Sequence, residues 1–265
     1  DLHSFPTRRS SDLVGGSVLP VPPYFEEPDR YYDRTSQTVE TMVDYLADNH
    51  WDNPNYINIL DRPYVSVFTS DMRKYSNNNK EMSHADMINY MKEYSWRKYR
   101  IEPYLATVCL RATHALDHLA AGADSMTGYG FLPDFTESMR RPIQNYREQV
   151  IKRVEEWDTI QEQIDKPYTP PVVVGWDASP RGSIPEGRHF RDVQGMYPFT
   201  PIVTDSNAID FGDMLCQQKR FIMNNTPQEE RYTPITAWNE ITEGAALLPK
   251  ILPDRSEEHT SELQS

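Results

Sequence analysis

The sequence predicts a parallel α/β fold, because short apolar runs alternate along it with stretches of helical periodicity. The runs are rich in β-branched and aromatic residues, and no two of them are joined by a hairpin signal. Such alternation is typical of parallel strands connected by helices. Neither GxGxxG nor GxxxxGK(S/T) follows any run, so a nucleotide-binding sheet is not supported. The expected strands are residues 64–68, 104–110, 125–129, 171–176 and 234–238.

Helices are expected between these strands, each from an apolar stripe or a capping residue. The first begins at Thr35 or Ser36, either of which can cap a helix, and its apolar stripe consists of Val39, Met42, Val43 and Leu46. Gly122 ends the third helix. The expected helices are residues 35–46, 83–94, 113–121, 142–164 and 205–223.

The architecture expected is a (β/α)8 barrel of the TIM type. Acidic residues follow the last predicted strand, and barrel enzymes keep their catalytic residues at the C-terminal ends of strands. A closed barrel has eight strands, which is more than the runs found here. We therefore expect a truncated barrel, whose missing strands, chiefly N-terminal ones, lie outside this sequence.

The two ends of the chain look foreign to the rest. Residues 1–13, DLHSFPTRRSSDL, and residues 255–265, RSEEHTSELQS, match in-frame translations of standard sequencing adapters. The alternative is a natural basic head and acidic tail. Segments of this kind are set aside from fold reasoning, which leaves residues 14–254 as a partial catalytic barrel. Because the true N-terminus is expected to be missing, localisation is left open, and a secreted or periplasmic location is compatible with the sequence.

Charge and composition narrow the class of partner. The net charge of −13 argues against a nucleic-acid partner, which would require a basic face. A neutral sugar fits this charge, and some of the 16 Tyr, 9 Phe and 5 Trp are suited to packing on sugar rings, although half or more must serve the core.

Cys109 and Cys216 have no metal-ligand spacing and are expected to be buried thiols. No run approaches the roughly 18 apolar residues of a membrane span.

The candidate catalytic residues are two acids, Glu240 and Glu243, in the stretch TAWNEITEGAALLP. Paired carboxylates carry out glycoside cleavage. If the chain turns helically after Glu240, both side chains share one face, about 5–6 Å apart at Cβ, and Gly244 permits the tight bend that this needs. If the chain stays extended, the two acids point in opposite directions. The alternative is that one Glu caps a helix and the other is solvated.

This stretch resembles the N-E-W-x-E-G signature of glycoside hydrolase family 99-like proteins. That group includes endo-acting mannosidases and the WbsX-like family, described as glycosyltransferases of polysaccharide biosynthesis. The resemblance implies that Glu243 is the general acid on the leaving oxygen and Glu240 the base toward the sugar's own 2-hydroxyl. The reaction would pass through a 1,2-anhydro sugar with overall retention, and would use no metal or cofactor. Burial would keep Glu243 protonated while hydrogen bonds hold Glu240 ionised.

The chain departs from that signature close to the acids. Ile241 and Thr242 stand where Trp and His are usual, and Leu248 stands where an acidic residue is common. Specificity for mannan therefore does not follow from the resemblance, but both acids are retained.

The candidate substrate-binding residues also follow predicted strands. The run GWDASPR resembles the W-D-N-x-P-R segment of the WbsX-like group, with Ala178 in place of Asn, and it contains Trp176, Asp177 and Arg181. Asp177 at a strand end could reach a sugar, or could form a structural clamp with Arg181. Tyr129 lies between two glycines, which would allow a ligand to approach its ring closely.

Two further candidates directly precede the acids in the sequence. Asn239 could donate to a sugar hydroxyl or orient Glu240, or it could be a satisfied amide at the end of a strand. Trp238 could be a sugar platform, although a core position is the better expectation.

His114 and His118 have zinc-like spacing on one helix face, but no third ligand is evident and a solvated face is expected.

Three functions fit these observations. The first is a retaining, mannosidase-like glycoside hydrolase acting on a polysaccharide or glycan. The second is a WbsX-like glycosyltransferase, which should show a basic or metal-carboxylate site for a nucleotide diphosphate; no DxD motif is found. The third is a non-catalytic carbohydrate-binding domain, which would keep the aromatic residues but would not need both acids in one cleft.

Overall fold

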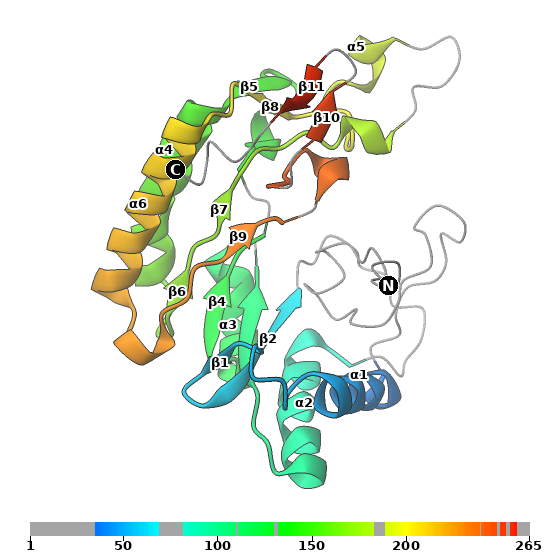
Figure 1. Ribbon diagram of the computed structural model, residues 1–265, viewed down its shortest axis with the longest axis vertical. Coiled ribbons are helices and arrows are strands. Elements are labelled where there is room, and N and C mark those ends of the chain that lie inside the picture. Colours follow the sequence, from blue (N-terminus) through cyan, green and yellow to red (C-terminus); the bar gives the residue numbers. More distant parts are fainter. Residues whose placement is uncertain are drawn as a thin grey trace. The chain divides into compact units, whose positions relative to one another are not determined.

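The chain is described from a computed structural model (Figure 1). It divides into two compact units, each described here by itself. The first contains the chain up to Thr127 with Ile160–Thr169 and Asn225–Arg231, and the second contains Gly128–Thr159, Pro170–Asn224 and the chain from Tyr232. No helix among the described residues is long and apolar enough to cross a membrane. The described residues are 35–68, 82–109, 111–129, 132–182, 189–238, 240–247, 250–252 and 255–258.

A five-stranded sheet forms the centre of the first unit, with the strand order β1-β2-β3-β4-β6. The strands β2, β3, β4 and β6 are parallel neighbours (Figure 1). The parallel arrangement predicted for the runs at 64–68, 104–110 and 125–129 is therefore confirmed. The strands are β1 (Asn58–Ile59), β2 (Arg62–Phe68), β3 (Tyr104–Val108), β4 (Ser125–Thr127) and β6 (Tyr168–Thr169).

The antiparallel hairpin between β1 and β2 was not predicted from the sequence. Leu60 and Asp61 connect the two strands, and both have positive φ angles, 54° and 56°. A two-residue turn with this backbone usually carries Asn or Gly, because a side chain with a bulky Cβ is strained there. Leu60 is not such a signal, which is why the sequence pattern did not reveal the hairpin.

The first two helices of the first unit begin where their capping residues predict. Thr35 caps α1 (Ser36–Asn49) by accepting a hydrogen bond from the amide of Thr38. Ser83 and Asp86 form a capping box at the start of α2 (His84–Tyr99). The third helix is α3 (Ala112–Ala120). The stripe predicted for α1 is buried, which satisfies the hydrophobic effect on one face of the helix.

His118 on α3 is buried, so the expected solvated face is wrong for this residue. Its Nδ1 lies 3.0 Å from the hydroxyl of Thr107 and 3.6 Å from the thiol of Cys109. The face of α3 that carries His118 also carries Ala115 and Leu119, both buried, and the imidazole is buried with them. Cys109 is buried as predicted.

The second unit contains two parallel two-stranded ladders. In one, β7 (Val172–Val173) pairs with β9 (Ile235–Thr236). In the other, β5 (Ile143–Asn145) pairs with β8 (Ile202–Thr204). The runs predicted at 171–176 and 234–238 therefore do form parallel neighbours, although the ordered strands within them are short.

The expectation that all five predicted strands belong to one sheet is wrong, since those two pair in a separate ladder. Pro170 and Pro171 separate β6 from β7, and a proline has no amide to donate to a ladder. Among the described residues the recorded pairings do not close a barrel.

Two long helices, α4 (Tyr146–Glu162) and α6 (Ala208–Asn225), run alongside each other (Figure 1). The rings of Trp157 on α4 and Phe221 on α6 meet edge to face, 5.8 Å apart. Cys216 lies on the exposed side of α6, so its prediction as a buried thiol is wrong. It lies two residues after the buried Met214, which is about 200° around the helix.

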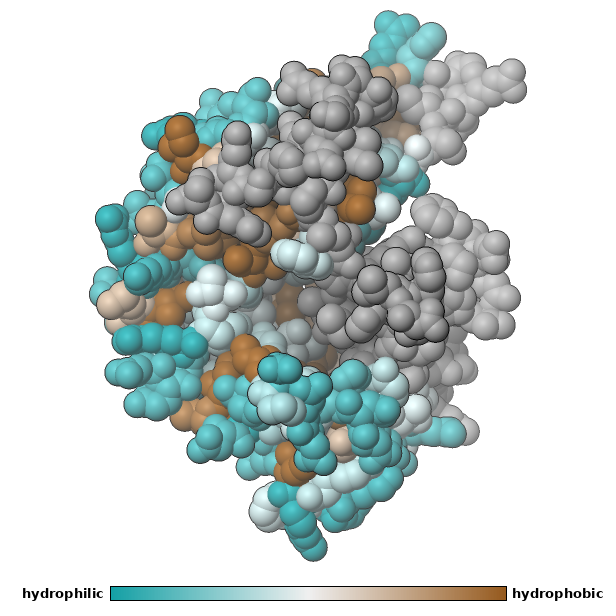
Figure 2. Space-filling view, in the orientation of Figure 1, coloured by the Kyte–Doolittle hydropathy of each residue, from teal (hydrophilic) through white to brown (hydrophobic). Residues whose placement is uncertain are grey.

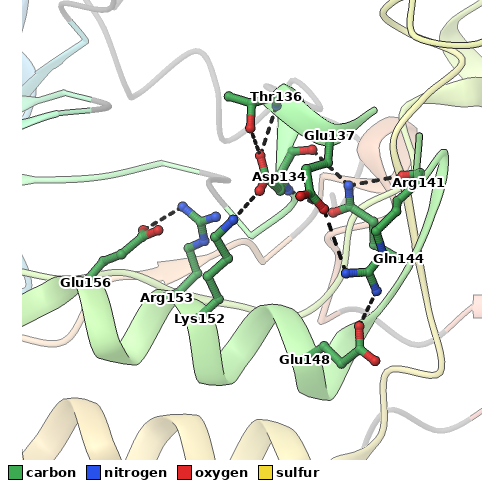
Figure 3. Close-up of polar contacts among 9 residues, drawn as sticks. All are labelled: Asp134, Thr136, Glu137, Arg141, Gln144, Glu148, Lys152, Arg153 and Glu156. Atoms are coloured by element: carbon green, nitrogen blue, oxygen red, sulfur yellow. Dashed lines mark hydrogen bonds and ion pairs between the residues drawn. The ribbon is translucent and has the colours of Figure 1, made fainter. Parts of the chain in front are cut away.

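A polar cluster fastens the loop before β5 to α4 (Figure 3). The buried amide of Gln144 exchanges two hydrogen bonds of 2.8 Å with the backbone of Asp134. The side chain of Asp134 caps the 3-10 turn η2 (Phe135–Glu137) through Thr136 and contacts Lys152 of α4. Burial raises the pKa of Asp134, but the hydrogen bonds from Lys152 and Thr136 outweigh burial and lower this pKa to about 2. The loop therefore has a fixed backbone, from which Phe135 packs against Trp176 at 5.7 Å.

The last described segment is an antiparallel pair, β10 (Lys250–Leu252) and β11 (Arg255–Glu258). The second of these strands lies in the stretch 255–265 that is expected to be adapter sequence. The pairing is with the adjacent strand and does not bear on the origin of the stretch. Residues 1–13 lie outside the described residues. On the face seen in Figure 2 hydrophilic residues predominate, as a charged fraction of 25% leads one to expect.

Candidate active site

The two acids predicted from the sequence lie in one tight turn of the second unit. Glu240 directly precedes the 3-10 turn η5 (Ile241–Glu243), and Glu243 is its last residue. In a 3-10 turn, side chains three residues apart lie above one another. The helical alternative of the two weighed for this stretch is therefore the one observed. Both acids are buried, with 1% of Glu240 and 5% of Glu243 exposed.

One guanidinium, that of Arg181, bridges both carboxylates. Its Nη2 lies 3.0 Å from Oε1 of Glu240, and its Nη1 lies 2.6 Å from Oε1 of Glu243. Arg181 ends the 3-10 turn η3 (Ser179–Arg181), which follows β7, whereas the acids follow β9, the strand that pairs with β7. The parallel pairing thus brings the cation and both anions to the same end of one ladder.

Tyrosine hydroxyls surround Glu243. The hydroxyl of Tyr129 donates to its Oε2 at 3.2 Å, and that of Tyr197 donates to its Oε1 at 3.5 Å. Arg181 in turn donates to the oxygen of Tyr197 at 2.9 Å. Both oxygens of Glu243 therefore have donors from outside its own turn.

Glu240 has an asymmetric environment. Its Oε1 accepts from Arg181 and from the hydroxyl of Thr242, at 2.6 Å for the latter. Its Oε2 is buried and has no hydrogen-bond partner within the part of the chain that the structure describes. A buried polar atom without a partner is costly, so this oxygen is suited to accept a proton from a ligand.

The surroundings of Glu243 favour its neutral form. Burial raises its pKa above the ordinary value, Arg181 opposes this, and the charge of Glu240 adds to the rise. Burial also raises the pKa of Tyr129, and the two carboxylates raise it further, so this phenol remains a donor. A carboxyl whose pKa is raised by burial is suited to hold a proton and donate it.

Gly244 makes the turn possible. Its φ angle is +64°, and a Cβ atom there would lie 2.8 Å from the amide nitrogen of Asp177. That amide donates to the carbonyl of Glu243 at 2.7 Å. The backbone after β7 therefore packs directly on the turn that carries the acids, which glycine alone allows.

Asp177 and Arg181 do not form the clamp considered from the sequence. Asp177 accepts from the amide and hydroxyl of Ser179, at 2.9 and 2.6 Å, and so orders the turn that leads to Arg181. The short side chain of Asp177 finds its donors two residues along the chain, as is common in turns, while Arg181 reaches the acids instead.

The two tryptophans near the site differ in exposure. Trp238 is 60% exposed, so the expected core position is wrong: it follows the last paired residue of β9, and the buried neighbours are Thr236 and Ala237. Trp176 is 7% exposed and packs on Phe135. Asn239 lies outside the described residues.

Tyr197 and Thr242 were not identified as site residues from the sequence. Tyr197 lies in a loop before β8, far along the chain from both acids, and no spacing rule connects it with them. Thr242 is signalled only by its place between the two acids.

Other candidate sites lie elsewhere or are not found. A cavity of about 500 Å³ in the first unit is lined partly by Asp124, Asp165 and Glu230, and no residue around the acid pair lines it. Within the described residues no group of three or more His, Cys, Asp or Glu side chains is arranged to hold a metal ion. The acid pair is therefore the site with the clearest chemistry.

Solved structures with a similar fold include glycoside hydrolases. A GH99 endo-α-mannosidase from Bacteroides thetaiotaomicron, in complex with bis-tris propane, has a TM-score of 0.55 and 18% identity, covering 87% of this chain and 62% of that chain. The fold is GH99-like. A second structure of a GH99 endo-α-mannosidase from this organism has a TM-score of 0.53 and 15% identity, covering 87% of this chain and 58% of that one. A glycoside hydrolase-like protein has a TM-score of 0.54 and 13% identity, covering 90% and 61%.

At these sequence identities, the similarity to GH99 structures shows the fold alone. The chain spans about three fifths of the length of these matched structures. No family model and no curated protein matches the sequence.

Proposed function

We propose that this chain carries the catalytic acids of a retaining, mannosidase-like glycoside hydrolase that acts on a polysaccharide or glycan. The observation that carries the proposal is the buried pair Glu240 and Glu243, bridged by Arg181 within a GH99-like fold. Burial raises the pKa of Glu243, which suits a general acid. Glu240 suits a base, because its Oε1 has two donors and its Oε2 has none among the described residues.

The proposed reaction uses the sugar's own 2-hydroxyl as nucleophile. Oε2 of Glu240 takes the hydroxyl proton while O2 attacks the anomeric carbon, and the glycosidic bond breaks as Glu243 protonates the leaving oxygen. In the second step Glu243, now a carboxylate, takes a proton from water, and the water oxygen attacks the anomeric carbon. The bond from O2 to that carbon breaks, and O2 recovers its proton from Glu240. Inversion at each step gives overall retention.

The remaining site residues are proposed to bind or orient. Tyr129 and Tyr197 hold Glu243 by hydrogen bonds. The exposed indole of Trp238 is a candidate platform for a sugar ring, and Asp177, Trp176 and Asn239 are retained as candidates near the substrate.

The same proposal includes a (β/α)8 barrel. Parallel pairing in both units and the likeness to GH99 structures support it.

Paired substrates test the assignment of the two acids. Glu243→Gln should lower kcat/KM about 10²- to 10⁴-fold on a glycoside with a poor leaving group, and less on an activated aryl glycoside, which needs less acid assistance. Glu240→Gln should impair both substrates equally, because both need the base. Glu229→Gln, at an exposed position, is the control and should match wild type.

Two results would contradict the proposal. If Glu240→Gln and Glu243→Gln both retain wild-type hydrolysis, the acids are not catalytic. If the protein transfers sugar only from a nucleotide donor, the glycosyltransferase alternative holds. If it binds glycans without any turnover, it is a non-catalytic carbohydrate-binding domain.

A further inference from the structure

The hydroxyl of Thr242 joins the cation of the site to the proposed base. It accepts the Nε–H of Arg181 at 2.9 Å and donates to Oε1 of Glu240 at 2.6 Å. The direction follows from the groups themselves, because a guanidinium only donates and an ionised carboxylate only accepts. The single hydroxyl proton of Thr242 is therefore committed to Glu240.

These contacts make the two oxygens of Glu240 unequal. Thr242 and Nη2 of Arg181 both act on Oε1, at 2.6 and 3.0 Å, which leaves Oε2 without a partner among the described residues. The terminal torsion of a glutamate is soft and roughly two-fold, so only such contacts can select one orientation. Loss of the hydroxyl would leave Oε1 with one donor and would free the carboxylate to turn.

Arg181 is held by the same hydroxyl. Its Nη2 donates to Glu240, its Nη1 to Glu243 and to Tyr197, and its Nε–H to Thr242. Four contacts therefore hold the planar guanidinium in one orientation. The sequence has Thr at this position where the resembled family usually has His, and a threonine hydroxyl between a carboxylate and a guanidinium is thus a feature of this chain.

We infer that Thr242 is a positioning residue for the base: its hydroxyl bridges Arg181 and Glu240, and so keeps Oε2 of Glu240 turned toward the substrate's hydroxyl. This inference rests on the proposed function of Glu240. It deepens that proposal by assigning a role to a residue that would not itself touch the reacting atoms.

The test replaces the hydroxyl and keeps the shape. Thr242→Val should lower kcat about 10- to 100-fold, the value of one hydrogen bond to a charged group, with little change in KM. Because the hydroxyl donates to the charged form of Glu240, its loss should also move the low-pH limb of the activity profile to higher pH. Thr242→Ser keeps the hydroxyl and should restore both properties. A uniform loss in Val and Ser variants, with an unmoved profile, would overturn the inference.

A matched control exists in the same unit. Thr136 donates to Asp134, two residues earlier, at 2.6 Å, which is the contact that Thr242 makes with Glu240 (Figure 3). Thr136→Val should leave kcat and the pH profile unchanged. If it reproduces the effects of Thr242→Val, those effects are general consequences of removing such a contact, and the inference fails.

A second readout separates this inference from the proposed function. The Glu240 carboxyl can be followed by NMR in ¹³C-glutamate-labelled protein, with its signal assigned from Glu240→Gln. The groups around it are Arg181, Glu243, Tyr129 and Tyr197, and Thr242→Val replaces none of these side chains. The carboxyl signal of Glu240 should change its chemical shift in Thr242→Val and stay in place in Thr136→Val. If wild type hydrolyses no glycoside, the proposed function fails, whereas an unchanged Glu240 signal in Thr242→Val refutes the positioning role.

Discussion

Arg181 is the residue on which the charge balance of the site depends. Its side chain is 21% exposed, and those of Glu240 and Glu243 only 1% and 7%, so solvent screens the three charges little. Removal of the cation would leave two buried carboxylates beside each other. Such an unpaired buried charge costs about 3–5 kcal/mol.

We therefore expect Arg181→Met to lower the free energy of unfolding by about 3–5 kcal/mol at neutral pH. The control is Arg147→Met, which removes an ion pair with Asp210 whose arginine is 62% exposed, and it should cost no more than about 1 kcal/mol. Urea unfolding at pH 7 measures both. Equal losses would show that the Arg181 bridge is not energetically special.

Glu243 should make stability depend on pH in a particular direction. Burial raises its folded-state pKa above the ordinary value of 4.5, with Arg181 opposing and Glu240 adding. The folded state then binds the proton more tightly than the unfolded state, so the free energy of unfolding falls as pH rises from 4.5 through the folded-state pKa.

Glu243→Gln removes this contribution. The variant's stability relative to wild type should rise across the same pH window and then level off. Urea unfolding between about pH 4 and 8 checks the sign, and Glu229→Gln should parallel wild type. A relative stability that falls with pH would mean that Arg181 dominates over burial.

At the level of single residues, the sequence predicted the acids but not their partners. A local motif can be read within a few residues, and so Glu240, Glu243 and the bend at Gly244 were identified. The partners of Arg181 and the contact of Tyr197 depend on pairing between distant strands, which no local spacing encodes. Trp238 was misjudged because its hydrophobicity does not show where β9 ends.

Among the elements, the turn η5 depends on one glycine. Gly244→Ala should destabilise the protein by at least about 1–2 kcal/mol, because the residue adopts a left-handed conformation and its Cβ would press on Asp177. Gly212→Ala is the matched control, because Gly212 lies inside α6 and no atom of the described residues is within 4 Å of a Cβ placed there. That change should stabilise by about 0.5–1 kcal/mol. Thermal unfolding of both variants decides, and a neutral Gly244→Ala would contradict the packing argument.

Elements with a strong local signal were predicted and those without were not. Capping residues marked α1 and α2, and β-branched runs marked the parallel strands. The hairpin at Leu60 was missed because its turn residues are atypical, and the short strands β5 and β8 were missed because three residues carry too little pattern.

For the whole molecule, the acidic balance predicts the class of partner. With a net charge of −13 the protein lacks the excess of cations that phosphate backbones require. Exclusion of nucleic acid remains a prediction of the sequence. The barrel also remains a prediction, because the strand pairings within the described residues form a five-stranded sheet and separate two-stranded ladders, with no closure. Barrel closure depends on strands far apart in the chain, which sequence patterns do not connect.

The ends of the chain supply the last prediction. Residues 1–13 and 255–265 are proposed to derive from adapter sequence, and β11 in the second stretch pairs with β10 alone among the described strands. An isolated two-stranded pair is marginally stable in water. Deleting both stretches should therefore change the free energy of unfolding by less than about 0.5 kcal/mol and leave any glycoside turnover intact.

A longer deletion is the control for the trimmed chain. Removing residues 240–265 also takes away both acids and the contact between Glu243 and Asp177, and it should lower the urea midpoint clearly. Arg181 would lose both of its carboxylate partners, and the backbone after β7 would lose its contact with Gly244. If trimming residues 1–13 and 255–265 costs as much as this deletion, the two stretches are part of the fold and their proposed origin is wrong.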